Sequence, residues 1–231
     1  MKKILFLIPG SFLILIFTGS TCKTDLANMT HLSYTFLSLG DSYTIGESVL
    51  PAENFPNQTV QLLRKNGFDF YSPEIVAKTG WTTDELQATI NNHEFHPPYD
   101  FVTLLIGVNN QYRGRTVDNY KPEFENLLKQ AIQFTAGKAD HVIVVSIPDW
   151  GATPFAQGRD RAQIAKEIDD YNAANKSITE SYKVNYVDIT PGTREALTDP
   201  SLVAGDGLHP SAKDYARWAE KIADKIKPLI K

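Results

Sequence analysis

The sequence predicts a single α/β domain in which helices cover both faces of a parallel β-sheet. Segments with strand character alternate five times with segments of helical periodicity. Two of the strand segments, residues 100–107 and 141–151, are almost continuously apolar, as in strands that are covered on both faces. The chain has no internal repeat and no linker long enough to separate domains. These observations predict one three-layer α/β/α sandwich with a five-stranded sheet.

Each predicted strand is a short apolar or β-branched run that ends at a glycine or a polar turn. The five strands are predicted at residues 34–39, 74–80, 100–107, 141–151 and 184–189.

The helices between them are indicated by apolar residues at helical spacing and by capping signals. They are predicted at residues 54–67, 82–92, 121–134 and 162–182, with a last helix that starts near Ser211. Thr82 and Glu85 are spaced as a capping box, and Asp214 fits the same role after Ser211.

Composition excludes several classes of protein. The chain has 231 residues, of which 42% are hydrophobic, and this is enough for a full core. Its formal charge is −4 without basic blocks, which argues against nucleic acid as a partner. A single cysteine rules out an intramolecular disulfide.

The N-terminus predicts export. Residues 1–21 have the basic start, short apolar run and small residues of a secretory signal peptide, and residues 22–33 form a polar leader before a domain at residues 34–231. Cys22 follows the signal, as in a bacterial lipoprotein, although Gly19 and Thr21 depart from the usual motif. We therefore expect a periplasmic or cell-envelope protein with a lipid anchor at Cys22. The alternative is ordinary cleavage near Cys22 and a secreted protein.

Ser42 is the first candidate for chemistry. It follows the first predicted strand in "FLSLGDSYTIGES", where the chain turns sharply at an edge of the sheet. Ligands of open parallel sheets bind beyond the carboxyl ends of the strands, so a serine there can act as a nucleophile. Aspartate and serine are also favoured helix caps, and "GDS" by itself favours that structural role.

"DGLHP" supplies the groups that such a serine needs. A serine hydroxyl requires a base, usually an imidazole, and a carboxylate that fixes the tautomer of the imidazole. Asp206 and His209 are three residues apart in a loop that Gly207 and Pro210 keep from being helical. The alternative is a surface loop that leads into the last helix.

Two further candidates follow other predicted strands. Asn109, in "GVNNQYRG", can donate its amide N–H to a developing oxyanion, although Asn-Asn also suits a polar turn. Gly80, in "KTGWTTDEL", allows a substrate to approach its backbone N–H closely, but is a weak signal alone. Because carboxyl ends of parallel strands share one edge, all four segments are expected there together.

This combination and order of segments resembles the SGNH hydrolases, also called the GDSL family of esterases and lipases. The resemblance extends from about Phe36 to the last helix. It rests on Gly40-Asp41-Ser42, Gly80, Gly107-Val108-Asn109 and Asp206-Gly207-Leu208-His209.

The resemblance implies a role for each residue and the flavodoxin-like strand order 2-1-3-4-5. Ser42 is the implied nucleophile, His209 the general base and then acid, and Asp206 the residue that orients it. The implied oxyanion hole consists of the backbone N–H groups of Ser42 and Gly80 with the Asn109 side chain. The family block usually reads Gly-x-Asn-Asp, and Asn110 replaces that aspartate here.

Other motifs are discounted. "HEFH" at residues 93–96 has the wrong histidine spacing for a zincin helix and is followed by Pro97, so we expect no metal. No glycine-rich phosphate loop is present, so no cofactor is expected. Trp81, Tyr112 and Trp150 follow strands and can line an acyl or aryl pocket or simply pack.

We therefore predict a serine esterase that forms an acyl-enzyme. Its expected substrate is an ester met outside the cytoplasm: a small-molecule, lipid or acetylated glycan ester. A thioesterase or lysophospholipase with the same triad is the first alternative. A non-catalytic exported binding or envelope protein on the same fold is the second.

Overall fold

The computed structural model describes residues 33–230 and contains a five-stranded parallel sheet. Its strands are β1 (Phe36–Asp41), β2 (Glu74–Lys78), β3 (Phe101–Leu105), β4 (Val142–Val145) and β5 (Asn185–Val187). They lie in the order β2-β1-β3-β4-β5, as predicted. The predicted signal peptide, most of the leader and Cys22 lie outside the described residues.

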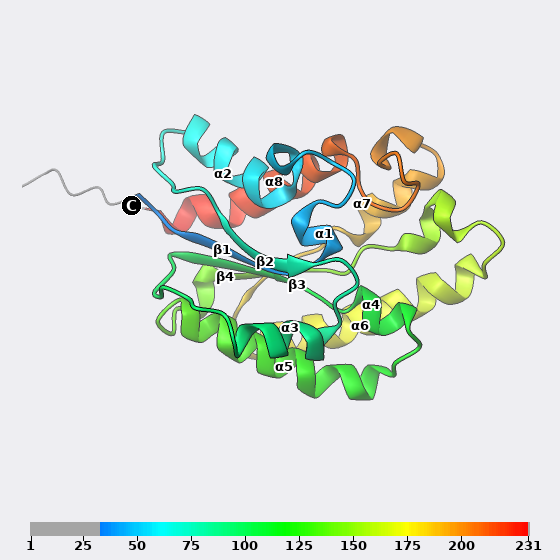
Figure 1. Cartoon of the computed structure of the whole chain (residues 1–231), viewed down its shortest axis with the longest axis horizontal. Coiled ribbons are helices and arrows are strands. Elements are labelled where there is room, and N and C mark those ends of the chain that lie inside the picture. The colour runs from blue at the N-terminus through cyan, green and yellow to red at the C-terminus, as the bar shows by residue number, and fades with distance from the viewer. Residues whose placement is uncertain (1–32, 231) are drawn as a thin grey trace, which may run out of the picture. The chain divides into compact units, whose positions relative to one another are not determined.

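Helices cover both faces of the sheet (Figure 1). The helices α2 (Phe55–Lys65) and α8 (Ala212–Ile226) lie on one face, and α3 (Thr83–Ile90), α5 (Val117–Phe134) and α6 (Arg161–Ser181) lie on the other. The short helices α1 (Ser42–Ile45), α4 (Val108–Tyr112) and α7 (Thr190–Arg194) follow β1, β3 and β5. These three short helices therefore lie at the carboxyl edge of the sheet.

The core lies between the sheet and its two helical layers. Every residue of β1, β3 and β4 is buried, which explains why β3 and β4 read as continuous apolar runs. Phe55 and Trp218 pack together on one face, and Tyr120 and Phe124 do so on the other. Burial on both faces makes the carboxyl edge a rigid base for its loops.

The capping predictions are confirmed, but several element bounds differ. Glu85 accepts the Thr82 N–H in the capping box of α3, and Ser211 accepts the Asp214 N–H at the start of α8. The prediction began α5 at residue 121 because it followed the helical spacing of apolar residues from Phe124 onward. The helix instead begins at Val117, where the Thr116 side chain caps it.

The predicted fourth strand was also too long. β4 ends at Val145, and the rest of the segment is a loop followed by the 3₁₀ turn η4 (Trp150–Ala152). The Asp149 side chain caps that turn by accepting the Gly151 N–H, which continued apolarity in the sequence did not reveal. Within residues 33–230, no helix is long and apolar enough to cross a membrane.

Candidate active site

The turn after β1 presents Ser42 as the first residue of α1. Asp41 is the N-cap, and its carboxylate accepts the Tyr43 N–H at 3.0 Å. The capping role that the sequence left open for Ser42 therefore belongs to its neighbour. Within residues 33–230 the Ser42 hydroxyl has no hydrogen-bond partner, and the N–H of a first helical residue has no acceptor within its own helix.

Gly40 allows this turn to form so close to the sheet. A Cβ at this position would lie 2.1 Å from the Thr44 hydroxyl oxygen and 2.5 Å from the Leu105 carbonyl oxygen. Both distances are far shorter than van der Waals contact. The first turn of α1 thus folds back onto the end of β1, and this holds Ser42 at the edge of the sheet.

The loop before α8 holds the imidazole of His209. Its Nδ1 lies 2.6 Å from Asp206 Oδ2, and Asp206 Oδ1 accepts the backbone N–H groups of Leu208 and His209 at 2.9 and 3.0 Å. The Tyr43 ring lies against the imidazole, with 4.9 Å between ring centroids. Because Asp206 engages Nδ1, Nε2 remains available for a proton from another group.

The two aspartates near these residues differ in pKa. Burial raises the pKa of Asp41 to about 7, although hydrogen bonds from Tyr43 and Asn109 oppose the shift. Partial burial also works to raise the pKa of Asp206, but hydrogen bonds from His209, Leu208 and Ser48 outweigh it and lower the pKa to about 2. Asp206 is thus ionised at neutral pH, as an acceptor from an imidazole must be.

Asn109 lies at the start of α4, beside the end of β1. Its Nδ2 donates to the Trp81 carbonyl at 3.0 Å and to Asp41 Oδ2 at 3.4 Å. The second contact is long, so this N–H can turn to an oxyanion at little cost.

Asn110, which replaces the family aspartate, is fully buried and supports the neighbouring helix. Its Oδ1 accepts the Thr83 N–H at 3.1 Å, and its Nδ2 donates to the Thr83 hydroxyl at 2.6 Å. The amide therefore satisfies two groups at the start of α3.

Gly80 lies in the turn after β2 with a φ of +85°, a conformation that favours glycine. Its carbonyl accepts a hydrogen bond from Arg113 at 2.6 Å, and its N–H bonds to no other described residue. Gly80 is not among the residues that line the pocket around Ser42. The structure connects its loop to that pocket through Trp81, whose carbonyl holds Asn109.

Ser42, Asn109 and His209 meet in one pocket of about 130 Å³. The rest of its lining is aromatic or aliphatic: Tyr43, Val108, Tyr112, Trp150, Phe155 and Leu208. Three of the aromatic rings pack together. The Trp150 ring centroid lies 5.3 Å from that of Tyr112 and 5.9 Å from that of Phe155. Of the three aromatic residues considered from the sequence, Tyr112 and Trp150 line the pocket and Trp81 does not.

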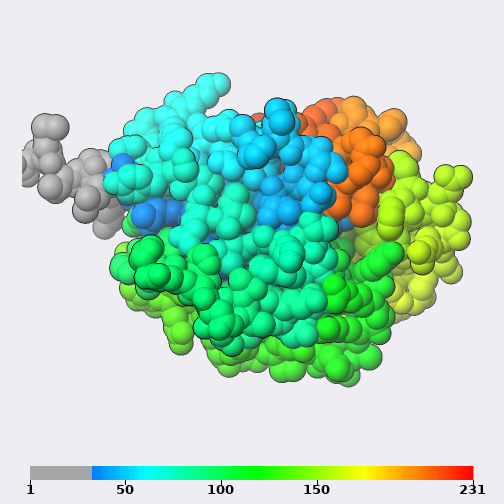
Figure 2. Space-filling view, in the orientation of Figure 1, coloured from blue at the N-terminus to red at the C-terminus, as the bar shows by residue number. Residues whose placement is uncertain are grey.

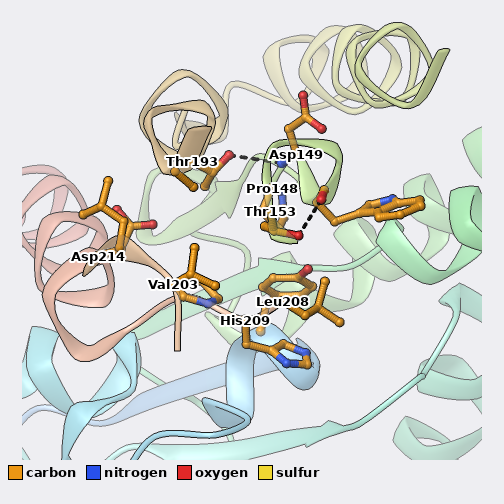
Figure 3. A pocket seen from close by; sticks show the side chains of 13 residues that line it. Pro148, Asp149, Thr153, Thr193, Val203, Leu208, His209 and Asp214 are labelled. Atoms are coloured by element: carbon orange, nitrogen blue, oxygen red, sulfur yellow. Dashed lines mark hydrogen bonds between the residues drawn. The ribbon is translucent and has the colours of Figure 1, made fainter. Parts of the chain in front are cut away.

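His209 also lines a smaller cavity of about 20 Å³ (Figure 3). Val203, Leu208 and His209 group on one side of it, facing Asp149 and Thr153. Asp149 is buried and accepts a hydrogen bond from Arg194 at 2.8 Å, so the loop after β4 is tied to α7. The cavity has room for about one water molecule, not for a substrate.

Three residues at this edge were missed from the sequence. Ser48 donates to Asp206 Oδ2 at 2.7 Å, Gln111 accepts from the Trp150 indole at 2.7 Å, and Phe155 lines the pocket. No spacing rule connects Ser48 with Asp206, which lies 158 residues away. Gln111 is the only one with a local signal, since it follows Asn109 in the same block.

Residues 33–230 contain no group of three or more histidine, cysteine or acidic side chains that could hold a metal ion. His93, from the discounted "HEFH" segment, instead contacts Glu74 at 2.9 Å on the surface.

The strand order and the grouping of segments at one edge define the SGNH hydrolase fold. The chain belongs to the GDSL-like lipase/acylhydrolase family, whose model matches residues 38–217. Members of this family are ester hydrolases. A search of curated protein sequences finds no significant match.

Several solved structures share the fold. A lipase/acylhydrolase from Enterococcus faecalis matches with a TM-score of 0.64 and 19% identity, over 86% of this chain and 97% of its own. An acetylxylan esterase from Geobacillus stearothermophilus matches with a TM-score of 0.64 and 20% identity, over 84% of this chain and 94% of its own. A psychrotrophic esterase from Pseudoalteromonas sp. matches with a TM-score of 0.63 and 16% identity, over 85% of this chain and 98% of its own.

Proposed function

We propose that this protein is a serine esterase that cleaves carboxylic esters of short acyl or aryl groups through an acyl-enzyme. One observation carries the proposal. Ser42, Asn109 and His209 line the same apolar pocket, while Asp206 engages the ring nitrogen of His209. This is the set of groups that acyl transfer by a serine requires.

In the proposed reaction, His209 Nε2 takes the Ser42 proton as the hydroxyl oxygen attacks the ester carbonyl carbon. The oxyanion accepts hydrogen bonds from the Ser42 N–H and from Asn109 Nδ2, whose residues both line the pocket. The Gly80 N–H, whose residue lies outside that lining, is the third donor that the family resemblance implies. The carbon–oxygen bond to the alcohol then breaks, and His209 gives its proton to the leaving oxygen. His209 then takes a proton from water as the water oxygen attacks the acyl carbon. The bond from this carbon to Ser42 Oγ breaks, and His209 returns the proton to Oγ as the acid leaves. Asp206 stays ionised throughout, in keeping with its pKa of about 2.

The size and lining of the pocket support a short acyl or aryl group. At about 130 Å³ it is smaller than the sites that enclose drug-sized ligands, which are typically about 300–1,000 Å³. The structural neighbours include an acetylxylan esterase and an esterase inhibited by monoethylphosphonate, and acetyl and ethyl are both two-carbon groups. A short acyl ester of a small molecule or a glycan fits these observations better than a long-chain lipid.

A serine-directed fluorophosphonate probe tests the catalytic role of Ser42. The folded wild-type protein should be labelled and Ser42→Ala should not. Ser201→Ala, which changes an exposed serine that bonds to Asp199, is the matched control and should be labelled like the wild type. Absence of labelling in the wild type would favour the non-catalytic binding protein, and equal labelling of Ser42→Ala would place the reactive group elsewhere.

A substrate panel tests the acyl preference. We expect kcat/KM to be higher for p-nitrophenyl acetate and butyrate than for the octanoate ester. Thioesters of the same acids and a lysophospholipid complete the panel. A preference for the lysophospholipid or for thioesters would contradict the esterase assignment in favour of the corresponding alternative.

We also propose that the protein acts outside the cytoplasm, at the cell envelope, with a lipid on Cys22. The proposal rests on the signal-like residues 1–21 and on the position of the cysteine. Mass spectrometry of the mature N-terminus tests it. Diacylglyceryl-modified Cys22 is the expected result, and an unmodified Cys22 or cleavage elsewhere would contradict it.

A further inference from the structure

Ser48, in the loop after α1, shares a carboxylate oxygen with the proposed base. Its hydroxyl donates to Asp206 Oδ2 at 2.7 Å, and the same oxygen lies 2.6 Å from His209 Nδ1. The other oxygen of Asp206 accepts two backbone N–H groups. The Asp206 carboxylate therefore has four donors, of which only Ser48 comes from a distant part of the chain. In Figure 2 the blue segment that follows β1 lies against the orange segment that carries Asp206.

The backbone of Ser48 adopts a conformation that serine seldom takes. Its φ is +67°, and within residues 33–230 only Ala136 and Lys183 share a positive φ without being glycine. Those two directly follow the C-caps of α5 and α6, where left-handed residues commonly end helices. Ser48 has no such explanation, because Gly46 already serves as the left-handed cap of α1. A strained residue beside a candidate site is a reason to look for a function.

The neighbouring residue fixes the loop from the other side. The Thr79 hydroxyl donates to the Glu47 carboxylate, so Glu47 is tied to the loop after β2 while Ser48 is tied to the loop before α8. The loop after α1 thus links the segments that carry Gly80 and Asp206. This double attachment gives the Ser48 hydroxyl a fixed direction.

From this geometry we propose that Ser48 is a positioning residue, which holds Asp206 in line with His209 and shares the negative charge of Oδ2 with the imidazole. The proposal rests on the proposed esterase function. The ionisable groups around the imidazole are Asp206, Tyr43 on α1, and Asp149 and Asp214 across the smaller cavity. Ser48 bonds to Asp206 alone among them, so its effect passes through this carboxylate.

Removal of the hydroxyl should have two effects. Asp206 loses a constraint on its rotation, and we expect kcat to fall about tenfold, as when other supporting hydrogen bonds around a functional group are removed. Oδ2 then accepts from the imidazole alone, which favours the imidazolium. The acid limb of the kcat/KM–pH profile should therefore move to higher pH by about half a unit.

Ser48→Ala and Ser48→Gly together test the proposal, with p-nitrophenyl acetate as the substrate. Glycine adopts a φ of +67° without strain, so Ser48→Gly removes the hydroxyl while it eases the backbone. Both variants should show the lower kcat and an acid limb of the kcat/KM–pH profile shifted to higher pH. Ser33→Ala is the matched control, because Ser33 makes an exposed 2.6 Å hydrogen bond to Asp69 at the start of the described chain.

Wild-type kcat and pH profile in both Ser48→Ala and Ser48→Gly would overturn the proposal. Full activity in Ser48→Gly with loss in Ser48→Ala would also overturn it, because the backbone alone would then matter. These results are distinguishable from failure of the proposed function. In that case the wild type is not labelled by the fluorophosphonate, or Ser42→Ala is.

Discussion

Two aspartates lie at the same edge of the sheet, and the protein treats them in opposite ways. Asp41 is fully buried beside Ser42, and burial raises its pKa to about 7. The Asp206 side chain is 29% exposed beside His209, and its pKa falls to about 2 because four donors outweigh its partial burial. Such divergence shows that donors and water, not the residue type, decide whether a carboxylate is charged.

The two segments that carry these aspartates are also held in place by different interactions. The turn after β1, residues 40–45, is held by packing, because Gly40 has no room for a Cβ and Asp41 is shielded from water. The acid loop, residues 206–210, is held by hydrogen bonds around one carboxylate. Substitutions in the turn should therefore affect stability most, and substitutions in the loop should affect catalysis.

The largest effect should come from the acid loop. Asp206→Asn retains the size of the side chain but no longer fixes the imidazole tautomer, so kcat for p-nitrophenyl acetate should fall about a thousandfold or more. Steady-state kinetics at about pH 7.5 measures this fall in kcat. Asp199→Asn is the control: its carboxylate also has a pKa of about 2 but is bonded to Lys213 and Ser201. Similar losses in both variants would contradict a specific role for Asp206.

The next largest effect is the pH dependence of stability that arises from the buried Asp41. The folded-state pKa of Asp41 lies above its ordinary value of 3.8, so the folded protein binds more protons than the unfolded chain between these values. The Asp41 contribution to stability should be lost as pH rises from about 4 to 7, by up to about 4 kcal/mol. Asp206 has the opposite sign: its contribution is present above its ordinary pKa and is lost as pH falls toward 2.

Urea unfolding of the wild type and Asp41→Asn at several pH values between about 4 and 8 measures this difference. The asparagine can still accept the Tyr43 N–H, so the cap is retained. Asp214, whose pKa burial raises to about 6, titrates in the same range but is common to both proteins. Parallel stability–pH curves would show that Asp41 does not titrate as its burial implies.

A smaller loss of stability should follow Gly40→Ala. The added methyl group meets the Thr44 hydroxyl and the Leu105 carbonyl, and such overpacking costs about 3 kcal/mol. Gly67→Ala is the matched control, since a Cβ there meets nothing and only the positive φ costs about 1 kcal/mol. Equal losses of unfolding free energy in the two variants would refute the packing account of the turn.

The smallest effect should come from restoring the family aspartate. Asn110→Asp can still accept the Thr83 N–H, but it competes with Glu123 for the Thr83 hydroxyl proton. The loss of one hydrogen bond should cost about 1 kcal/mol. Asn110→Ala removes both bonds and should cost more in the same unfolding assay. A larger loss for the aspartate than for the alanine would show that this buried position rejects charge.

Much of the fold could be predicted, because alternating apolar periods and capping residues are local signals. The positions of Ser42 and Asn109 followed from parallel strands that share one edge. Asp206 and His209 lie in the loop before α8 and do not directly follow a strand, so the argument that placed them at a strand end was wrong. The bounds of α5 and β4 were wrong because the predictions followed apolar residues, whereas caps at Thr116 and Asp149 mark where α5 and the turn η4 begin. Ser48 could not be predicted, since its bond to Asp206 depends on two loops that meet only in the folded chain. The proposed roles of the site residues remain predictions.

Trp150 offers a spectroscopic use of the pocket. It is one of three tryptophans in the chain and the only one that lines the pocket with Ser42. Trp218 lies in the core against Phe55, and the carbonyl of Trp81 faces Asn109. An acyl group that enters the pocket changes the surroundings of a single indole. In a variant with phenylalanine at positions 81 and 218, the fluorescence of this indole would report occupancy by any ligand, including one that is never hydrolysed.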